Sequence, residues 1–313
     1  MCTSIRFNDD NGNMFFGRNL DWSAGYNQKV VITPKGYKYN SAFLGEILPR
    51  YVVIGMSIVQ ENKPLYFDCA NNAGLAIAGL NFPGYAQYEP EPIEGKTNVA
   101  AYEFPLWVAM NFETVDEVES ALKDVAIVAK PIDNKYPVSL LHWMIGDKQR
   151  SIVVEYTKDG LQVFHNDIDV LTNQPGYAWH KENLRNYMNL ASLQPEKVNW
   201  GKAEIRPFGT GSMMRGLPGD YSSPSRFVRV AYLNCHYPKQ STEEGNVSRL
   251  FHTLAGVSMI DGAAAMANGD FEKTIYTGGF SAATNTYYWS TYDSPTIQKV
   301  SLSDFDIEGT ELI

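Results

Sequence analysis

The first stretch of the chain, MCTSIRFNDDNGNMFFGRNLDW (Met1–Trp22), decides the fold. Two apolar runs that read as β-strands flank the turn residues Asp10-Asn-Gly12, which is the pattern of a β-hairpin. Residue numbers paired across such a hairpin sum to about 21 or 22, so Cys2 lies opposite residues 19 and 20. The hairpin therefore predicts which side chains share a strand end with this cysteine.

Arg18 and Asp21 flank the point opposite Cys2, which brings a guanidinium and a carboxylate to a thiol. Removal of Met1 is favoured because Cys2 is small, and it would place a free α-amine on the residue that carries the thiol. Reference pKa values are about 7.7 to 8.0 for the amine and about 8.5 for the thiol, so the amine can accept the thiol proton near neutral pH. On spacing alone the alternative is an arbitrary cysteine beside a surface ion pair of negligible energetic weight.

Blocks of strands alternate with pairs of helices along the rest of the chain. Strands are expected at residues 3–8, 14–19, 28–33, 52–59, 65–69, 75–80, 139–145, 151–156, 161–166, 170–172, 274–280, 286–290 and 297–302. Helices are expected at 101–111, 114–125, 222–235 and 243–255, the second opened by a capping box of Thr114 and Glu117. Residues 85–98 read as a surface loop and 181–219 as an irregular segment.

This order predicts an α+β fold, a four-layer αββα sandwich of two antiparallel sheets flanked by helix pairs. No linker divides the 313 residues, so we expect a single domain over 1–313. A composition of 44% hydrophobic and 19% charged residues is typical of a globular protein.

The charge balance argues against several classes of partner. The chain carries 26 basic and 35 acidic residues, a net charge of -9, and no run of lysine and arginine. A nucleic-acid or anionic-membrane surface is therefore not expected. The N-terminus lacks the basic and apolar regions of a secretion signal, and no apolar stretch approaches the roughly 20 residues of a membrane span. We expect a cytoplasmic protein.

The cysteines and histidines do not predict a metal site. Three cysteines at wide spacings suit neither a disulfide framework nor a zinc site, and two of them, Cys69 and Cys235, read as buried apolar residues. Five histidines form neither HxH nor HExxH (His142, His165, His180, His236 and His252). We expect no metal and no organic cofactor.

Several longer motifs are shared, in order, with a known family. They are Met1-Cys2-Thr3, Phe16-Gly-Arg-Asn-Leu-Asp21, Gly79-Leu-Asn-Phe-Pro-Gly84, Leu141-His-Trp143, Ser151-Ile-Val-Val-Glu155, Leu171-Thr-Asn-Gln-Pro175, Gly216-Leu-Pro-Gly-Asp220, Ser223-Pro-Ser-Arg-Phe227 and Asn285-Thr-Tyr-Tyr288. In these motifs the chain closely resembles the choloylglycine hydrolase family of N-terminal-nucleophile amidases, which contains conjugated bile salt hydrolases and penicillin V acylases. The resemblance implies an αββα fold and hydrolysis of a linear amide without a cofactor.

The resemblance also implies roles for single residues. Cys2 matches the nucleophile, with its freed amine as the base, and Arg18 and Asp21 match the residues that support the thiol and the amine. Asn173 matches the side-chain donor to the oxyanion, and Asn81 the position whose backbone N–H is the second donor. The remaining active-site arginine of the family is matched by Arg226, which is expected to tune the charge around the thiolate from the start of its helix.

Without the resemblance, Asn81 and Asn173 would read as turn residues. Asparagine at position 81 is the bile-salt-type residue, where penicillin V acylases of the family tend to carry tyrosine. The leading hypothesis is therefore hydrolysis of glycine- or taurine-conjugated bile salts, with penicillin V or another N-acyl amide as the closest alternative. A non-catalytic bile-acid- or lipid-binding sandwich is the alternative of another class.

Two further expectations concern the acyl pocket and assembly. Phe67, Tyr26 and Tyr85 are candidates to line a hydrophobic acyl pocket, although packing in the core or on the surface is the default for aromatic residues. The segment at about 183–220 resembles the assembly arm of the family, so the resemblance implies a homotetramer.

Overall fold

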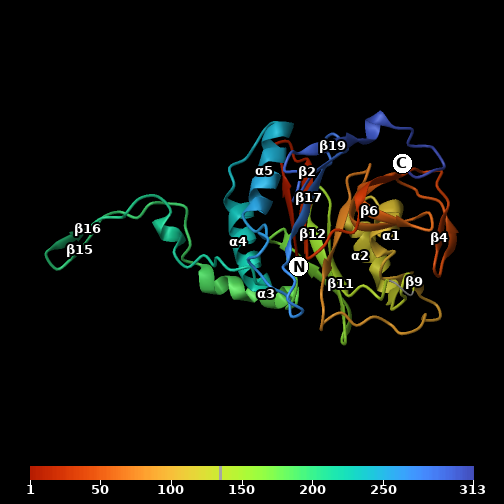
Figure 1. Ribbon diagram of the computed structural model, residues 1–313, viewed down its shortest axis with the longest axis horizontal. Coiled ribbons are helices and arrows are strands. Elements are labelled where there is room, and N and C mark those ends of the chain that lie inside the picture. Colours follow the sequence, from red (N-terminus) through yellow and green to blue (C-terminus); the bar gives the residue numbers. More distant parts are fainter. Residues whose placement is uncertain (134–135) are drawn as a thin grey trace.

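Two stacked sheets form the centre of the computed structural model, which describes residues 1–133 and 136–313 (Figure 1). The first sheet has the order β14 (Val170–Leu171), β1 (Cys2–Asn8), β2 (Met14–Trp22), β17 (Lys273–Ser281), β18 (Thr286–Thr291) and β19 (Gln298–Ser301). The second has the order β13 (Gly160–His165), β12 (Ser151–Thr157), β11 (Leu141–Gly146), β8 (Ala76–Asn81), β7 (Lys63–Asn71), β6 (Val53–Gln60) and β3 (Lys29–Thr33). The described strand pairs of both sheets are antiparallel, as predicted.

Helices cover the outer faces of the two sheets, which completes the predicted four layers (Figure 1). α4 (Ser223–His236) and α5 (Glu243–Ala255) pack on the first sheet, and α1 (Phe104–Asn111) and α2 (Val115–Ala121) lie on the side of the second. Thr114 caps α2, because its hydroxyl accepts a hydrogen bond from the Glu117 N–H at 3.2 Å. Among the described residues, no helix has the length and apolar character that a membrane crossing requires.

Close approach of α5 to the first sheet depends on two glycines. Leu250 lies over Gly17 and Gly279, and a Cβ added at Gly279 would lie 2.7 Å from Leu250 Cδ1. A side chain at either glycine would push the helix outward, because packed interiors have little free space. The helix therefore sits directly behind β17 and β2, the strand that carries both Arg18 and Asp21.

The register of the first hairpin agrees with the prediction from its turn. Cys2 pairs with Leu20 and Thr3 with Asn19. On the other side of β2, Asp21 pairs with Thr274 of β17. The C-terminal strand thus completes the sheet that the N-terminal hairpin begins.

Several short elements were missed by the sequence analysis. They are β4 (Tyr39–Ser41), β5 (Gly45–Ile47), β9 (Thr97–Ala100), β10 (Val125–Val128), α3 (Tyr177–Asn183), β15 (Val198–Trp200), β16 (Ala203–Ile205) and 3-10 turns at Leu122–Asp124, Leu184–Tyr187, Ser212–Met214 and Leu302–Asp304. The readings of 85–98 as loop and 181–219 as irregular were therefore wrong in part, and the helix predicted to end near residue 125 ends at Ala121. Strands of three or four residues are too short to show the two-residue hydrophobic period of a strand. β9 and β10 become strands only by pairing with each other.

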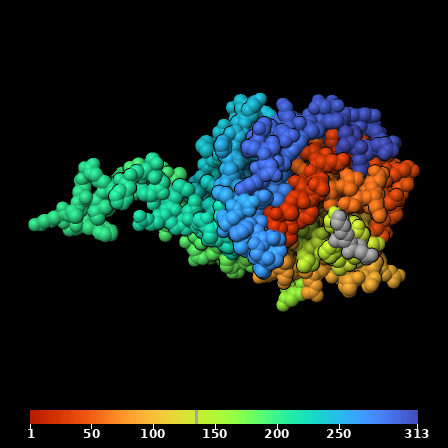
Figure 2. All heavy atoms as spheres, in the orientation of Figure 1, coloured from red at the N-terminus to blue at the C-terminus, as the bar shows by residue number. Residues whose placement is uncertain are grey.

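An extended arm projects from the body of the molecule between α3 and α4 (Figures 1 and 2). The hairpin of β15 and β16 forms its tip, and Gly201 makes the turn with a φ of 61°. Large apolar side chains are exposed along the arm, with 75% of Trp200 and all of Phe208 accessible. The arm therefore presents apolar side chains to solvent rather than to a core.

Candidate functional site

Cys2 lies at the start of β1 and is held by three polar contacts. Its Sγ accepts a hydrogen bond from Arg18 Nη2 at 2.7 Å, and its backbone carbonyl accepts one from Arg226 Nη1 at 2.5 Å. Its backbone N–H donates to Asn173 Oδ1 at 2.7 Å. The structure therefore brings four of the six predicted site residues into direct contact.

Arg18 is fully buried and its guanidinium is fixed by backbone carbonyls. Nη1 donates to Phe67 O at 3.1 Å and to Gly79 O at 2.8 Å, both in the second sheet. Nε donates to Asn19 O at 3.3 Å, and Nη2 donates to the thiol of Cys2. The Arg18 guanidinium therefore places a positive charge at hydrogen-bond distance from the Cys2 sulfur.

The pKa values of the two buried arginines of the site shift in opposite directions. Burial is the largest influence on each and by itself lowers the pKa, but the negative charges of Cys2 and Asp68 help to raise the pKa of Arg18 above its ordinary value. The pKa of Arg226 is lowered, because Asp21 and Cys2 only partly oppose the effect of burial. Both side chains remain cations at neutral pH, so one positive charge contacts the thiol of Cys2 and a second contacts its backbone carbonyl.

Asn173 connects Cys2, Arg226 and Asn81. Its Oδ1 accepts from Arg226 Nη2 at 2.7 Å as well as from the Cys2 N–H, and its Nδ2 donates to Asn81 O at 2.7 Å. These three contacts define which end of the amide is the donor. The backbone N–H of Asn173 donates to Ser223 Oγ at 2.9 Å, which anchors this residue to the first turn of α4.

Asp21 has one satisfied and one unsatisfied carboxylate oxygen. Oδ1 accepts from Thr274 Oγ1 at 2.6 Å, while Oδ2 lies 3.8 Å from Arg226 Nη1 and has no hydrogen-bond partner among the described residues. The α-ammonium of Met1 instead donates to the backbone carbonyl of Asp21 at 2.6 Å and to Glu272 Oε2 at 3.2 Å. A buried acceptor without a donor is rare in folded proteins, so Asp21 Oδ2 has room for a further hydrogen bond.

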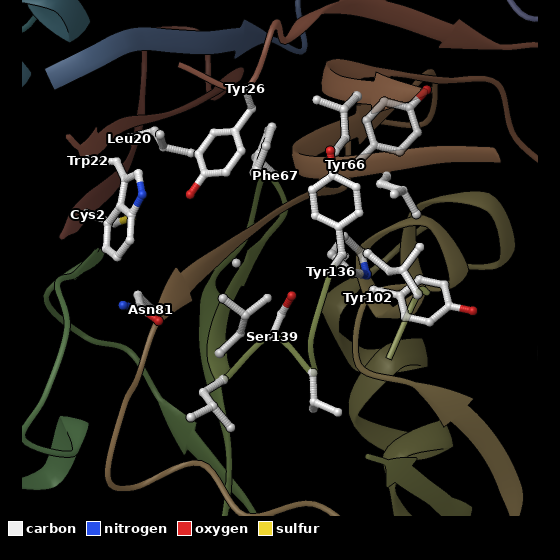
Figure 3. A pocket seen from close by; sticks show the side chains of 18 of the residues that line it. Cys2, Leu20, Trp22, Tyr26, Tyr66, Phe67, Asn81, Tyr102, Tyr136 and Ser139 are labelled. Carbon is white, nitrogen blue, oxygen red and sulfur yellow. The ribbon is translucent and has the colours of Figure 1, made fainter. Parts of the chain in front are cut away.

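A cavity of about 400 Å³ opens beside Cys2 (Figure 3). Phe67 and Tyr26, two of the three candidates, line it, and burial raises the pKa of Tyr26 to about 12, with a further contribution from the negative charge of Cys2. Tyr85 does not belong to the described lining and stacks on Phe82 instead, with ring centroids 5.1 Å apart. The cavity is therefore a mainly apolar site with a thiol at its wall.

The two ends of the cavity differ in chemistry (Figure 3). Cys2, Trp22 and Asn81 lie at one end, and the phenol groups of Tyr102 and Tyr136 at the other. Tyr26, Phe67 and Ser139 lie between them. Such a cavity suits an elongated apolar molecule whose reactive group reaches Cys2.

Polar groups that support the site were not found by the sequence analysis. Thr274 and Glu272 contact Asp21 and Met1, and Asp68 accepts hydrogen bonds from the phenols of Tyr276 and Tyr287 while lying near Arg18. Lone threonine, glutamate or aspartate residues carry no pattern that distinguishes them from surface positions. Within residues 1–133 and 136–313, no group of three or more histidine, cysteine or acidic side chains is arranged to hold a metal ion.

Residues 2–313 match the model of the linear amide C–N hydrolases, choloylglycine hydrolase family. The chain is 56% identical over its whole length to a bile salt hydrolase/transferase of Bifidobacterium longum subsp. longum, of which the alignment covers 99%. It is 43% identical over its whole length to a conjugated bile acid hydrolase of Lactobacillus gasseri, again with 99% coverage of the relative.

Solved structures give the same relationship. The C2A mutant of the conjugated bile acid hydrolase from Clostridium perfringens superimposes with a TM-score of 0.94 at 37% identity, covering 100% of this chain and 96% of that one. Penicillin V acylase from Agrobacterium tumefaciens has a TM-score of 0.78 at 18% identity, covering 99% and 90% of the two chains, which shows a shared fold.

Proposed function

The chain belongs to the choloylglycine hydrolase family of linear amide C–N hydrolases, and on this premise we propose that it hydrolyses the amide bond of glycine- or taurine-conjugated bile salts. The observation that carries the proposal is the position of the Cys2 thiol at one end of an elongated apolar cavity. A steroid acyl group is apolar and elongated, and its amide is at one end. The names of the relatives support the same substrate class.

The reaction begins, in this proposal, with removal of Met1. The α-amine that is freed on Cys2 can then donate to Asp21 Oδ2, which has no donor among the described residues while Met1 is present. As a neutral base this amine takes the proton of Sγ, and Arg18 stabilises the thiolate at hydrogen-bond distance. No histidine is required.

The thiolate then attacks the amide carbonyl of the substrate. Negative charge develops on the carbonyl oxygen, where Nδ2 of Asn173 and the backbone N–H of Asn81 are the proposed donors, each able to lower the barrier by about 3 to 4 kcal/mol. The protonated α-amine gives its proton to the departing glycine or taurine, which leaves a thioester on Cys2. Water attacks this thioester, the same amine accepts its proton, and the free bile acid and thiolate result.

Asn173→Ala is expected to lower kcat for glycocholate by about 100-fold or more, with a smaller change in KM, because an oxyanion donor acts mainly in the transition state. Asn173→Asp provides a matched variant, since it keeps an oxygen acceptor for Arg226 and removes the Nδ2 donor. Released glycine, measured with ninhydrin, gives the rates. Asn186→Ala, at an exposed position outside the site, serves as the control. A change in KM alone would instead place Asn173 in ground-state binding.

The substrate class is tested by comparing rates. Purified enzyme should hydrolyse glycocholate faster than phenoxymethylpenicillin, whereas the opposite order would favour the penicillin V acylase alternative. A non-catalytic bile-acid-binding protein would show neither activity. Alkylation of Cys2 with iodoacetamide distinguishes an enzyme from a binding protein. In an enzyme it should stop turnover, whereas binding of the ligand should survive.

We propose cytoplasmic action because a nucleophilic thiol must remain reduced. All three cysteines lie in the described part of the chain and are free. Disulfides are rare in the cytosol, where thiols are kept reduced. Cell fractionation followed by detection of the enzyme checks this location.

We propose that residues 1–313 act as one domain. We also propose that this domain assembles into a homotetramer through the arm of residues 188–217, which lies within the predicted segment 183–220. One domain is supported by the sheet that joins β1 and β2 to β17–β19 from the other end of the chain. Assembly is supported by the exposed apolar side chains of the arm, among them Met188, Trp200 and Phe208.

Trp200→Ser together with Phe208→Ser is expected to shift the protein to a smaller assembly, because both side chains are largely exposed in the single chain. Light scattering coupled to size exclusion measures the mass of wild-type and variant protein. Trp179→Ser is the matched control, since Trp179 is also a half-exposed tryptophan but lies on α3 outside the arm. A monomeric wild type, or a double variant of unchanged mass, would contradict the proposal.

A further inference from the structure

Two buried histidines contact consecutive carbonyls of the segment that carries Asn173. His142 Nε2 lies 2.8 Å from Thr172 O, and His180 Nε2 lies 2.9 Å from Asn173 O. Both imidazole rings are inaccessible to solvent. A carbonyl oxygen is an acceptor only, so each ring must carry a proton on Nε2 to make these contacts.

His142 also connects this segment to the strand end that carries Asn81. Its ring stacks on Phe82, the residue after Asn81, with centroids 4.0 Å apart and an interplanar angle of 7°. On its other side Nδ1 lies 3.1 Å from Glu155 Oε1, which also accepts a hydrogen bond from the Tyr177 N–H at 2.8 Å. One ring thus contacts a residue next to each of the proposed oxyanion donors, Thr172 before Asn173 and Phe82 after Asn81.

His180 is held on the opposite side of the same segment. Its ring stacks on Phe227 of α4, with centroids 4.6 Å apart and an interplanar angle of 12°. Burial lowers the pKa of His180 to about 4, so the ring is neutral near pH 7 and has one proton to donate. Nδ1 has no hydrogen-bond partner in the described part of the chain. The single donor of this ring is therefore committed to Asn173 O.

We propose that His142 and His180 are positioning residues that fix the backbone at Thr172 and Asn173, and thereby the direction in which Asn173 Nδ2 points. Neither ring belongs to the described lining of the cavity, so neither contacts substrate. The inference rests on the proposed function, since it concerns the donor that stabilises the oxyanion. A displacement of a donor by as little as about 1 Å can cost about 100-fold in rate, which is why the backbone beneath it matters.

The test compares two amide replacements of different reach at position 180. His180→Gln can place an N–H near the former Nε2, whereas His180→Asn is too short to reach Asn173 O. With glycocholate, His180→Asn is expected to lower kcat about 10-fold to 100-fold with KM changed less than about twofold, and His180→Gln to recover most of the rate. The rate of Cys2 alkylation by iodoacetamide should stay near the wild-type value in both variants, because the thiol and Arg18 are not altered.

His236→Asn is the matched control for loss of a stacked, carbonyl-bound histidine. Its Nδ1 lies 2.9 Å from Tyr232 O and its ring stacks on Tyr232, but it is exposed at the end of α4. We expect its kinetics to equal those of the wild type.

The double change His142→Gln with Glu155→Gln tests the other ring. It removes the buried His142–Glu155 ion pair and retains an N–H donor that can reach Thr172 O. It should keep more activity than His142→Leu.

Two results would overturn the inference. One is a kcat for His180→Asn within twofold of the wild type, and the other is a parallel fall of turnover and Cys2 alkylation, which would indicate general damage to the fold. If His180→Asn does not fold, His180→Leu replaces it under the same criteria. The same variants are also assayed on phenoxymethylpenicillin, which separates the test of the histidines from the test of the substrate. If the wild-type enzyme hydrolyses phenoxymethylpenicillin but not glycocholate, only the proposed substrate is overturned.

Discussion

Cys2→Ala is expected to lower hydrolysis of glycocholate by at least about 10⁴-fold, because it removes the proposed nucleophile while the oxyanion donors remain. The fold should persist, since the change removes one sulfur atom from a largely buried position and leaves the backbone contacts to Arg226 and Asn173 in place. Ninhydrin detection of glycine measures the rate, and thermal unfolding measures the stability of the variant.

Cys69→Ala is the matched control for this experiment. Cys69 is also buried, and burial together with the nearby charge of Asp68 raises the pKa of its thiol, so it is neither exposed nor activated. We expect the control to retain activity. Activity of Cys2→Ala near the wild-type rate in a folded protein would exclude the proposed mechanism.

Enzyme that keeps a residue before Cys2 is expected to show no turnover. In that form the Cys2 nitrogen is a peptide amide whose lone pair is delocalised, so it cannot take the thiol proton. The structure with Met1 present agrees with this, because the Cys2 N–H is a donor to Asn173 and Met1 contributes to the wall of the cavity. A removable protease tag placed directly before Cys2, without Met1 at the junction, makes the comparison within one preparation.

Removal of the tag should restore hydrolysis and increase the rate of Cys2 alkylation, because the thiol proton then has an adjacent acceptor. Intact mass confirms the state of the N-terminus in each sample. Histidine should not be the base, so single replacements of His142, His165, His180, His236 and His252 should each leave a measurable rate. Full activity with the tag still attached would show that the free amine is not the base.

Much of the fold could be predicted from local patterns. The turn at Asp10-Asn-Gly12 and the flanking apolar runs predicted the pairing of Cys2 with the end of β2, and the register Cys2 to Leu20 confirms it. Hairpins are predictable because turn geometry and the two-residue period of a strand depend on neighbours in the sequence. The short strands of the arm and the pair β9 and β10 lacked such a period.

Only part of the candidate site could be predicted from local sequence patterns. Spacing brought Cys2, Arg18 and Asp21 together, but Asn81 and Asn173 read as turn residues until the family resemblance implied other roles. The structure places Asn173 and Arg226 in contact with Cys2 across separations of 171 and 224 residues. Nothing in the chemistry of an isolated asparagine predicts such a contact.

The sequence by itself determined the first hairpin, the alternation of strands with helix pairs, and the juxtaposition of a thiol, a guanidinium and a carboxylate at one strand end. Tertiary structure alone decided the apolar cavity, the oxygen of Asp21 that has no hydrogen-bond donor among the described residues, and the two histidines beneath Asn173. The physical reason is that local conformation follows from neighbouring residues, whereas these features arise where two sheets and the helices outside them pack together. Their partners come from distant segments, and only the packing specifies which side chains meet.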